Sequence, residues 1–212
     1  MNLYKNRKAY HNYFIEETYE VVEAINKNDK ELLKEELGDV MLQVVFHAAM
    51  EEEQGGFDFD DVADGICKKL IERHPHVFGD ISVENTDEVL TNWDAIKRNS
   101  KKQKTTHQAM TSVPRELPAL MRAEKLQSKA AKAGAELTAD AVNYVEEKVS
   151  ALSSGINEEN IGELLFAVVA AARQSGIDTE EALTKVSDKF IADFDEYEKA
   201  DEDKKSSTKL YY

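Results

Sequence analysis

Apolar residues recur every three to four positions along most of this chain, which is the period of a helix with one buried face. The pattern predicts a first helix over residues 9–27 and a second over 30–54, which ends at Gly55-Gly56. The polar segment 26–29 lies between the two runs, so a helical hairpin is expected. Five apolar side chains of the first helix should point inward: Phe14, Ile15, Tyr19, Val22 and Ile25.

The rest of the chain is predicted to be helical as well, with breaks at proline and glycine. Further helices are expected over 60–73, 86–99 and 117–133, with a loop over 74–80. Only 9 Gly and 3 Pro occur in 212 residues, and 42% of the residues are hydrophobic. This composition favours helices around a real core, so the fold class is predicted to be all-α.

Charge and cysteine content limit the classes of function. The formal net charge of −15 argues against binding nucleic acid or an anionic membrane, both of which need basic surface. No apolar run is long enough to span a membrane, and the N-terminus shows no secretory signal. The single cysteine, Cys67, excludes an internal disulfide and is expected to be a small core residue. A cytoplasmic location is therefore expected.

Four carboxylates of the predicted hairpin carry the candidate chemistry. Glu17 and Glu20 share one face of the first helix, and Glu36 and Asp39 share one face of the second. In an antiparallel hairpin Glu17 faces Asp39 and Glu20 faces Glu36, so all four converge. Such a cluster repels itself unless a hard divalent cation such as Mg²⁺ binds it. The alternative interpretation is a solvated acidic face, the usual role of acid runs on helices.

The second half of the chain repeats the first. Glu147 matches Glu17, whereas the other three acids become Ser150, Asn160 and Glu163. This pattern predicts a tandem duplication, with residues 1–99 as an N-terminal helical domain that keeps the acidic motif. Residues 100–116 are predicted to be a linker, and 117–212 a second domain with a degenerate motif, so any active site should lie in the first half.

Several segments together resemble the MazG family of nucleoside triphosphate pyrophosphohydrolases. They read EETYEVVEAI, EELGDVMLQVVFHA, KLIERHPHVFGD, WDAIK and VPRELPALMRAEKLQ. The resemblance implies an all-α homodimer that uses Mg²⁺ to hydrolyse nucleoside triphosphates to monophosphate and pyrophosphate. It also implies that Glu17, Glu20, Glu36 and Asp39 are the metal and catalytic carboxylates. Typical members carry a C-P-W-D motif before the first acidic helix, and this chain begins after it.

Two pairs of residues are candidate substrate contacts. Lys69 and Arg73, one helical turn apart, could bind the triphosphate, although a surface pair is an equal possibility. Trp93 and Lys97, also one turn apart, could stack on the base and hold a phosphate, although a lone Trp is more often a core residue. His47 lies on an apolar face and is expected to be packed in the core.

Two other functions remain open. A di-iron carboxylate bundle needs Glu-x-x-His on two helices, and none of the five histidines lies three residues after a glutamate. A catalytically weak or inactive protein of the same fold, which only binds nucleotides or dimerises, is the second alternative. The base and sugar of the nucleotide are not specified by the sequence.

Overall fold

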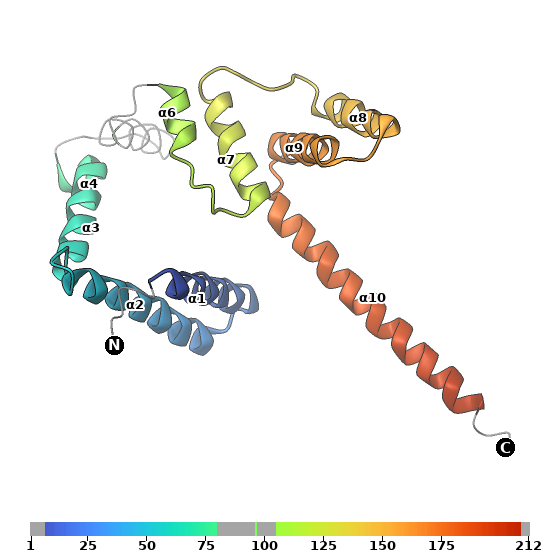
Figure 1. Cartoon of the computed structure of the whole chain (residues 1–212), viewed down its shortest axis with the longest axis horizontal. Coiled ribbons are helices and arrows are strands. Elements are labelled where there is room, and N and C mark those ends of the chain that lie inside the picture. Colours follow the sequence, from blue (N-terminus) through green and yellow to red (C-terminus); the bar gives the residue numbers. More distant parts are fainter. Residues whose placement is uncertain (1–6, 80–95, 97–104, 209–212) are drawn as a thin grey trace. The chain divides into compact units, whose positions relative to one another are not determined.

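The computed structural model describes residues 7–79, Ile96 and residues 105–208. Every regular element within these ranges is a helix, which confirms the predicted all-α class (Figure 1). The chain divides into two compact units, Met1–Lys97 and Arg98–Tyr212, and each is described by itself.

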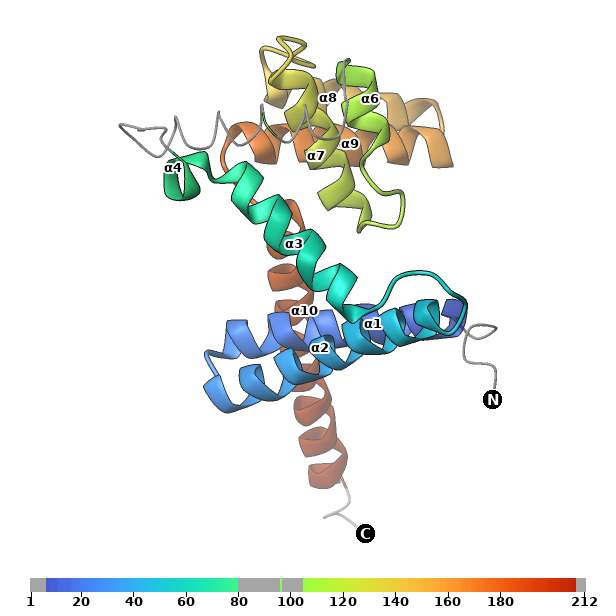
Figure 2. The same ribbon diagram turned by 90° about the vertical axis from the view of Figure 1, so that its left-hand side faces the viewer.

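An antiparallel hairpin dominates the first unit. Helices α1 (Arg7–Lys27) and α2 (Lys30–Glu52) run side by side, as two perpendicular views show (Figures 1 and 2). Asn28 makes the turn in the left-handed region at φ +53°, a conformation that Asn tolerates better than most residues. Asp29 then caps α2, because its Oδ1 accepts hydrogen bonds at 3.1 Å from two backbone N–H groups of the first turn. The short turn fixes the register of the hairpin.

The hairpin leads into a third helix and a single helical turn. Helix α3 (Phe59–Arg73) begins with a capping box, in which Asp58 and Asp61 each accept from the backbone N–H of the other. Helix α4 (Pro75–Phe78) occupies the segment that we expected to be a loop. Proline at the first helical position explains the difference, since its fixed φ suits a helix start.

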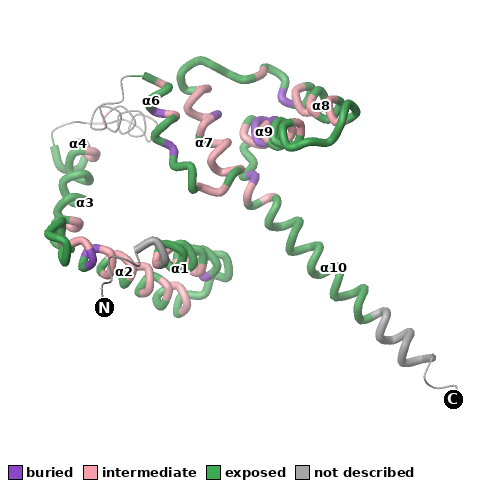
Figure 3. The backbone as a smooth tube through the Cα atoms, in the orientation of Figure 1, coloured by how far each residue is buried: buried purple, intermediate pink, exposed green. Residues whose placement is uncertain are grey.

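Most apolar side chains of the first unit stay exposed within that unit, contrary to the sequence expectation. Among the described residues of this unit, only Ala24, Ala48 and Met50 are buried, and Phe14 is half-buried. The other four residues expected to face inward, Ile15, Tyr19, Val22 and Ile25, are each more than 40% exposed. Figure 3 shows much of α1 in the colour of exposed residues. Cys67, expected in the core, is exposed as well. The exposure of the α1 residues has a simple cause, because a two-helix hairpin covers only one side of each helix.

The second unit contains a larger set of helices around a second hairpin. Its elements are α6 (Thr106–Thr111), α7 (Ala119–Ala131), α8 (Ala141–Ala151), the 3₁₀ turn η2 (Leu152–Ser154), α9 (Glu158–Gln174) and α10 (Thr179–Thr208). Helices α8 and α9 pack against each other, and α7 packs on α9. A hairpin followed by a further helix occurs in both units, the arrangement expected of a repeat, although the duplication itself stays a prediction.

The core of the second unit lies where α7 and α9 meet. Ala167, Val169 and Ala170 of α9 are fully buried, and Figure 3 shows buried residues on this helix. Gln127 of α7 is also buried, and its Nε2 donates to the carbonyl of Phe166 at 2.9 Å. This contact offsets part of the cost of burying an amide.

The linker expected over residues 100–116 contains the short helix α6, while most of the helix expected over 86–99 lies outside the described residues. Thr105 and Gln108 form a capping box that starts α6. Among the helices of the described ranges, none is both long and apolar enough to cross a membrane.

Candidate metal-binding site

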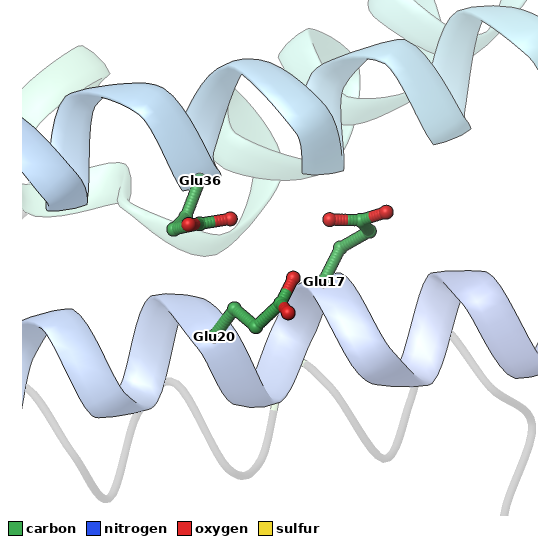
Figure 4. A group of neighbouring side chains, drawn as sticks. All are labelled: Glu17, Glu20 and Glu36. Atoms are coloured by element: carbon green, nitrogen blue, oxygen red, sulfur yellow. The ribbon is translucent and has the colours of Figure 1, made fainter.

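Three of the four predicted carboxylates gather between the helices of the first hairpin. Glu17 and Glu20 project from α1 toward Glu36 of α2 (Figure 4). One carboxylate oxygen from each lies within 4.8 Å of the other two. The three-residue spacing on α1 and the antiparallel register set by the turn together produce this cluster.

Asp39, the fourth predicted acid, lies one turn beyond Glu36 on α2 and is half-buried. It is not part of the group of oxygens within 4.8 Å. Its negative charge nevertheless acts on the cluster, because it helps to raise the pKa of both Glu17 and Glu36. The structure therefore places Asp39 beside the three glutamates.

Two carboxyls of the cluster, those of Glu17 and Glu36, have raised pKa values. Partial burial is the main cause of the raised pKa of Glu17, followed by a hydrogen bond and charge repulsion from Glu20. Partial burial is also the main cause for Glu36, followed by the charges of Glu20 and Asp39. Partial burial and mutual repulsion thus disfavour the ionised cluster, and a proton or a bound cation would relieve both.

Two acids that the sequence analysis did not single out belong to the same electrostatic environment. Glu23 and Glu35 each add to the repulsion that raises the pKa of Glu36. Their positions near Glu20 and Glu36 on the two helices were visible in the sequence. Both remain exposed, and the register of the hairpin explains why they are not part of the group of converging carboxylates.

The chemistry of the donor set fits a hard divalent cation. Carboxylate oxygens are the ligands that Mg²⁺ and Ca²⁺ prefer, and Mg²⁺ usually keeps several waters beside a few carboxylates. Three converging carboxylates, with the pKa values of Glu17 and Glu36 raised, meet these requirements. The residues present are therefore compatible with a Mg²⁺ ion at this position.

The other predicted site residues have different outcomes. Lys69 and Arg73 both lie on α3, where Lys69 is exposed and Arg73 is half-buried; their role stays a prediction. Trp93 and Lys97 lie outside the described residues. His47 is half-buried, with its ring centroid 5.9 Å from that of Phe14, in agreement with a packing role.

Comparisons with known proteins identify the chain's relatives. Residues 5–78 match the model of the MazG nucleotide pyrophosphohydrolase domain. The nucleoside triphosphate pyrophosphohydrolase of Escherichia coli K12 is 44% identical over 199 residues, which cover 88% of this chain and 75% of that protein. The nucleoside triphosphate pyrophosphohydrolase/pyrophosphatase MazG of Thermotoga maritima is 38% identical over 192 residues, which cover 88% and 73% of the two chains. As its motifs predicted, the chain belongs to the MazG nucleotide pyrophosphohydrolase family.

Proposed function

We propose that this protein hydrolyses nucleoside triphosphates to nucleoside monophosphate and pyrophosphate in a Mg²⁺-dependent reaction. The cluster of Glu17, Glu20 and Glu36 is the observation that carries the proposal. The names of the relatives support it, since the proteins of E. coli and T. maritima are both nucleoside triphosphate pyrophosphohydrolases.

The carboxylates of the hairpin would hold the metal. Glu17, Glu20 and Glu36 would be its ligands, with Asp39 as a fourth carboxylate next to them. When bound, Mg²⁺ supplies a Lewis acid for the α-phosphate and lowers the pKa of a water, so that pyrophosphate can leave. Through the ion that it holds, the cluster would also let this strongly acidic protein bind an anionic substrate.

The remaining chemistry belongs to side chains around the cluster. One of Glu16, Glu17 and Glu20 would accept the proton of the attacking water. Lys69 and Arg73 of α3 are proposed to bind the triphosphate and balance the charge of the leaving pyrophosphate. Trp93 and Lys97 are proposed to stack on the base and to contact a phosphate.

A homodimer is part of the proposal. The hairpin exposes large apolar side chains on both helices: Ile15, Tyr19, Val22 and Ile25 on α1, and Leu37, Met41, Leu42 and Val45 on α2. Adjacent apolar residues in such numbers mark an interaction surface, and a second copy of this chain is the partner we propose. Sedimentation analysis should give a dimer, and Met41→Glu should shift the protein toward monomer. A wild-type protein that stays monomeric at micromolar concentration would contradict this assembly.

The activity is tested by incubating the protein with a mixture of nucleoside triphosphates and Mg²⁺ and measuring pyrophosphate. Wild-type protein should release pyrophosphate, and EDTA should stop the release. The double change Glu36→Gln and Asp39→Asn should abolish it while circular dichroism shows unchanged helix content. Glu35→Gln is the matched control, because it removes an exposed carboxylate next to the cluster and should retain activity.

The alternative function, nucleotide binding without catalysis, makes a different prediction for the same experiment. Pyrophosphate would then be absent, while calorimetry would still detect binding of a triphosphate with Mg²⁺. Activity that survives in the double variant would show that the site lies elsewhere.

A further inference from the structure

The second hairpin carries a lysine at the point where the first hairpin carries its acidic cluster. Glu147 of α8 and Glu163 of α9 are the positions that match Glu17 and Asp39. The ammonium of Lys148 lies 3.1 Å from a carboxylate oxygen of each. It therefore bridges the two helices of the hairpin at the two matching positions that are still acidic.

The surroundings of Lys148 hold the ammonium in place. Its side chain is only 17% exposed, whereas those of Glu147 and Glu163 are 70% and 49% exposed. Its Nζ also lies 5.3 Å from the centre of the Tyr144 ring, a distance at which a cation is attracted to the ring face. The pKa of Lys148 is raised, mainly by its hydrogen bond to Glu163 and then by that to Glu147. The ammonium is thus anchored on three sides.

The two positions that lost their acids are engaged in local hydrogen bonds. Ser150 donates through Oγ to the carbonyl of Glu146 at 2.8 Å. Asn160 donates through Nδ2 to the carbonyl of Gly155 at 2.9 Å and so helps to close the turn of the hairpin. Neither side chain is turned toward a shared cation.

The first hairpin has no cation at the corresponding position. Thr18 matches Lys148, because each directly follows the first matched glutamate of its hairpin. The hydroxyl of Thr18 donates to the carbonyl of Phe14 at 2.7 Å, within its own helix. The first hairpin therefore keeps its clustered negative charge, whereas the second hairpin has a positive charge between its two remaining acids.

We propose that the Lys148 ammonium is a built-in cation, which takes in the second unit the place that a divalent ion takes at the acidic cluster of the first. This inference rests on the proposed function in assuming that the first cluster holds a metal. It follows that the second hairpin is closed without metal and binds none. The metal requirement of the chain then comes from the first unit alone.

The proposal is tested by putting the lost acids back into the second hairpin and measuring Mn²⁺ binding. The first cluster is disabled throughout by Glu17→Gln and Glu36→Gln. In this full-length background, one variant adds Ser150→Glu and Asn160→Glu and keeps Lys148. Its matched partner carries the same two changes together with Lys148→Thr. The two differ only in the lysine, and free Mn²⁺ is measured by electron paramagnetic resonance.

The variant that keeps Lys148 should take up no more Mn²⁺ than the background, because the ammonium already occupies the site. The variant with threonine should take up about one further ion per chain, as expected of a cluster with Mg²⁺-type ligands. Equal uptake by both variants, or uptake by neither, would overturn the proposal. Circular dichroism verifies that both variants keep their helices.

A second measurement does not depend on building a new site. In the wild-type background and in EDTA, Lys148→Met should lower the melting temperature more than Lys185→Met, which removes an exposed partner of Glu181. Combining Lys148→Met with Glu163→Gln should give less than the sum of the two separate losses, since both remove the same bridge. Fully additive losses would overturn the built-in cation. Neither measurement uses hydrolysis, so a failure of the proposed activity remains a separate result.

Discussion

Replacing Glu36 by glutamine should have opposite effects on metal binding and on the stability of the metal-free protein. Glutamine keeps the shape of the side chain but removes one of the three negative charges whose oxygens lie within 4.8 Å of one another. Changes to groups that only support a metal ligand already cost 10–100-fold in affinity, so losing a ligand should weaken Mg²⁺ binding by about 100-fold or more. Pyrophosphate release at limiting Mg²⁺ should fall at least as far.

Stability in EDTA should change in the other direction. The pKa of Glu36 is raised in the folded protein, which means that folding disfavours its ionised form at neutral pH. Glutamine carries no charge at any pH, so the variant avoids this unfavourable term. It should therefore unfold at a higher urea concentration than wild type when no metal is present.

Calorimetric titration with Mg²⁺ and urea unfolding in EDTA, both at neutral pH, measure the two effects. Glu35→Gln, at the exposed neighbouring position, should leave metal affinity close to that of wild type. The reasoning would be refuted if Glu36→Gln bound Mg²⁺ as tightly as wild type. It would equally be refuted if the variant were less stable than wild type in EDTA.

Three further predictions concern pH, a helix cap and a buried amide. Without metal, the free energy of unfolding should fall as the pH rises from about 4.5 through the raised pKa values of Glu17 and Glu36, because in this range the folded state binds more protons than the unfolded state. Urea titrations at several pH values test this, and saturating Mg²⁺ should remove the trend. Asp29→Ala should destabilise the first hairpin by about 1 kcal/mol, since two backbone N–H groups lose their acceptor, and Asp29→Asn should restore most of the loss in the same urea assay. Gln127→Ala should cost about 2 kcal/mol through the lost contact with Phe166 and the cavity left behind, as a lower melting temperature would show.

The sequence predicted the hairpin closely because its signals are local. The turn residues Asn28 and Asp29 adopt the conformations that their side chains favour, and α2 begins at residue 30 as expected. Once the turn is placed, the register follows, and the convergence of Glu17, Glu20 and Glu36 needs no further information. This part of the site was therefore accessible from spacing alone.

Burial was much harder to predict than helix position. Periodicity shows that a helix has an apolar face, but it does not show what covers that face. Tyr19 and Ile25 are regularly spaced apolar residues of α1, yet they are 55% and 57% exposed within this chain. Cys67 was expected in the core by residue type alone, and it is exposed for the same reason. Whether such a side chain is buried depends on the surface that packs against it, and the helical pattern does not specify that surface.

The two hairpins show two physical solutions to negative charge gathered between antiparallel helices. In the second, the ammonium of Lys148 joins Glu147 to Glu163 and cannot leave, so the hairpin is stable but has no position for an exchangeable ion. In the first, the charges of Glu17, Glu20 and Glu36 have no such partner at the position of Thr18. Partial burial, together with the repulsion between these carboxylates, raises the pKa of Glu17 and Glu36, so the ionised cluster carries a cost. At neutral pH a bound cation lowers that cost, which couples the stability of the hairpin to metal binding. A site that receives its cation together with an anionic substrate needs carboxylates without a fixed cationic partner. A cation fixed in place would already be paired with the carboxylates, which could then no longer hold an exchangeable metal ion for the substrate.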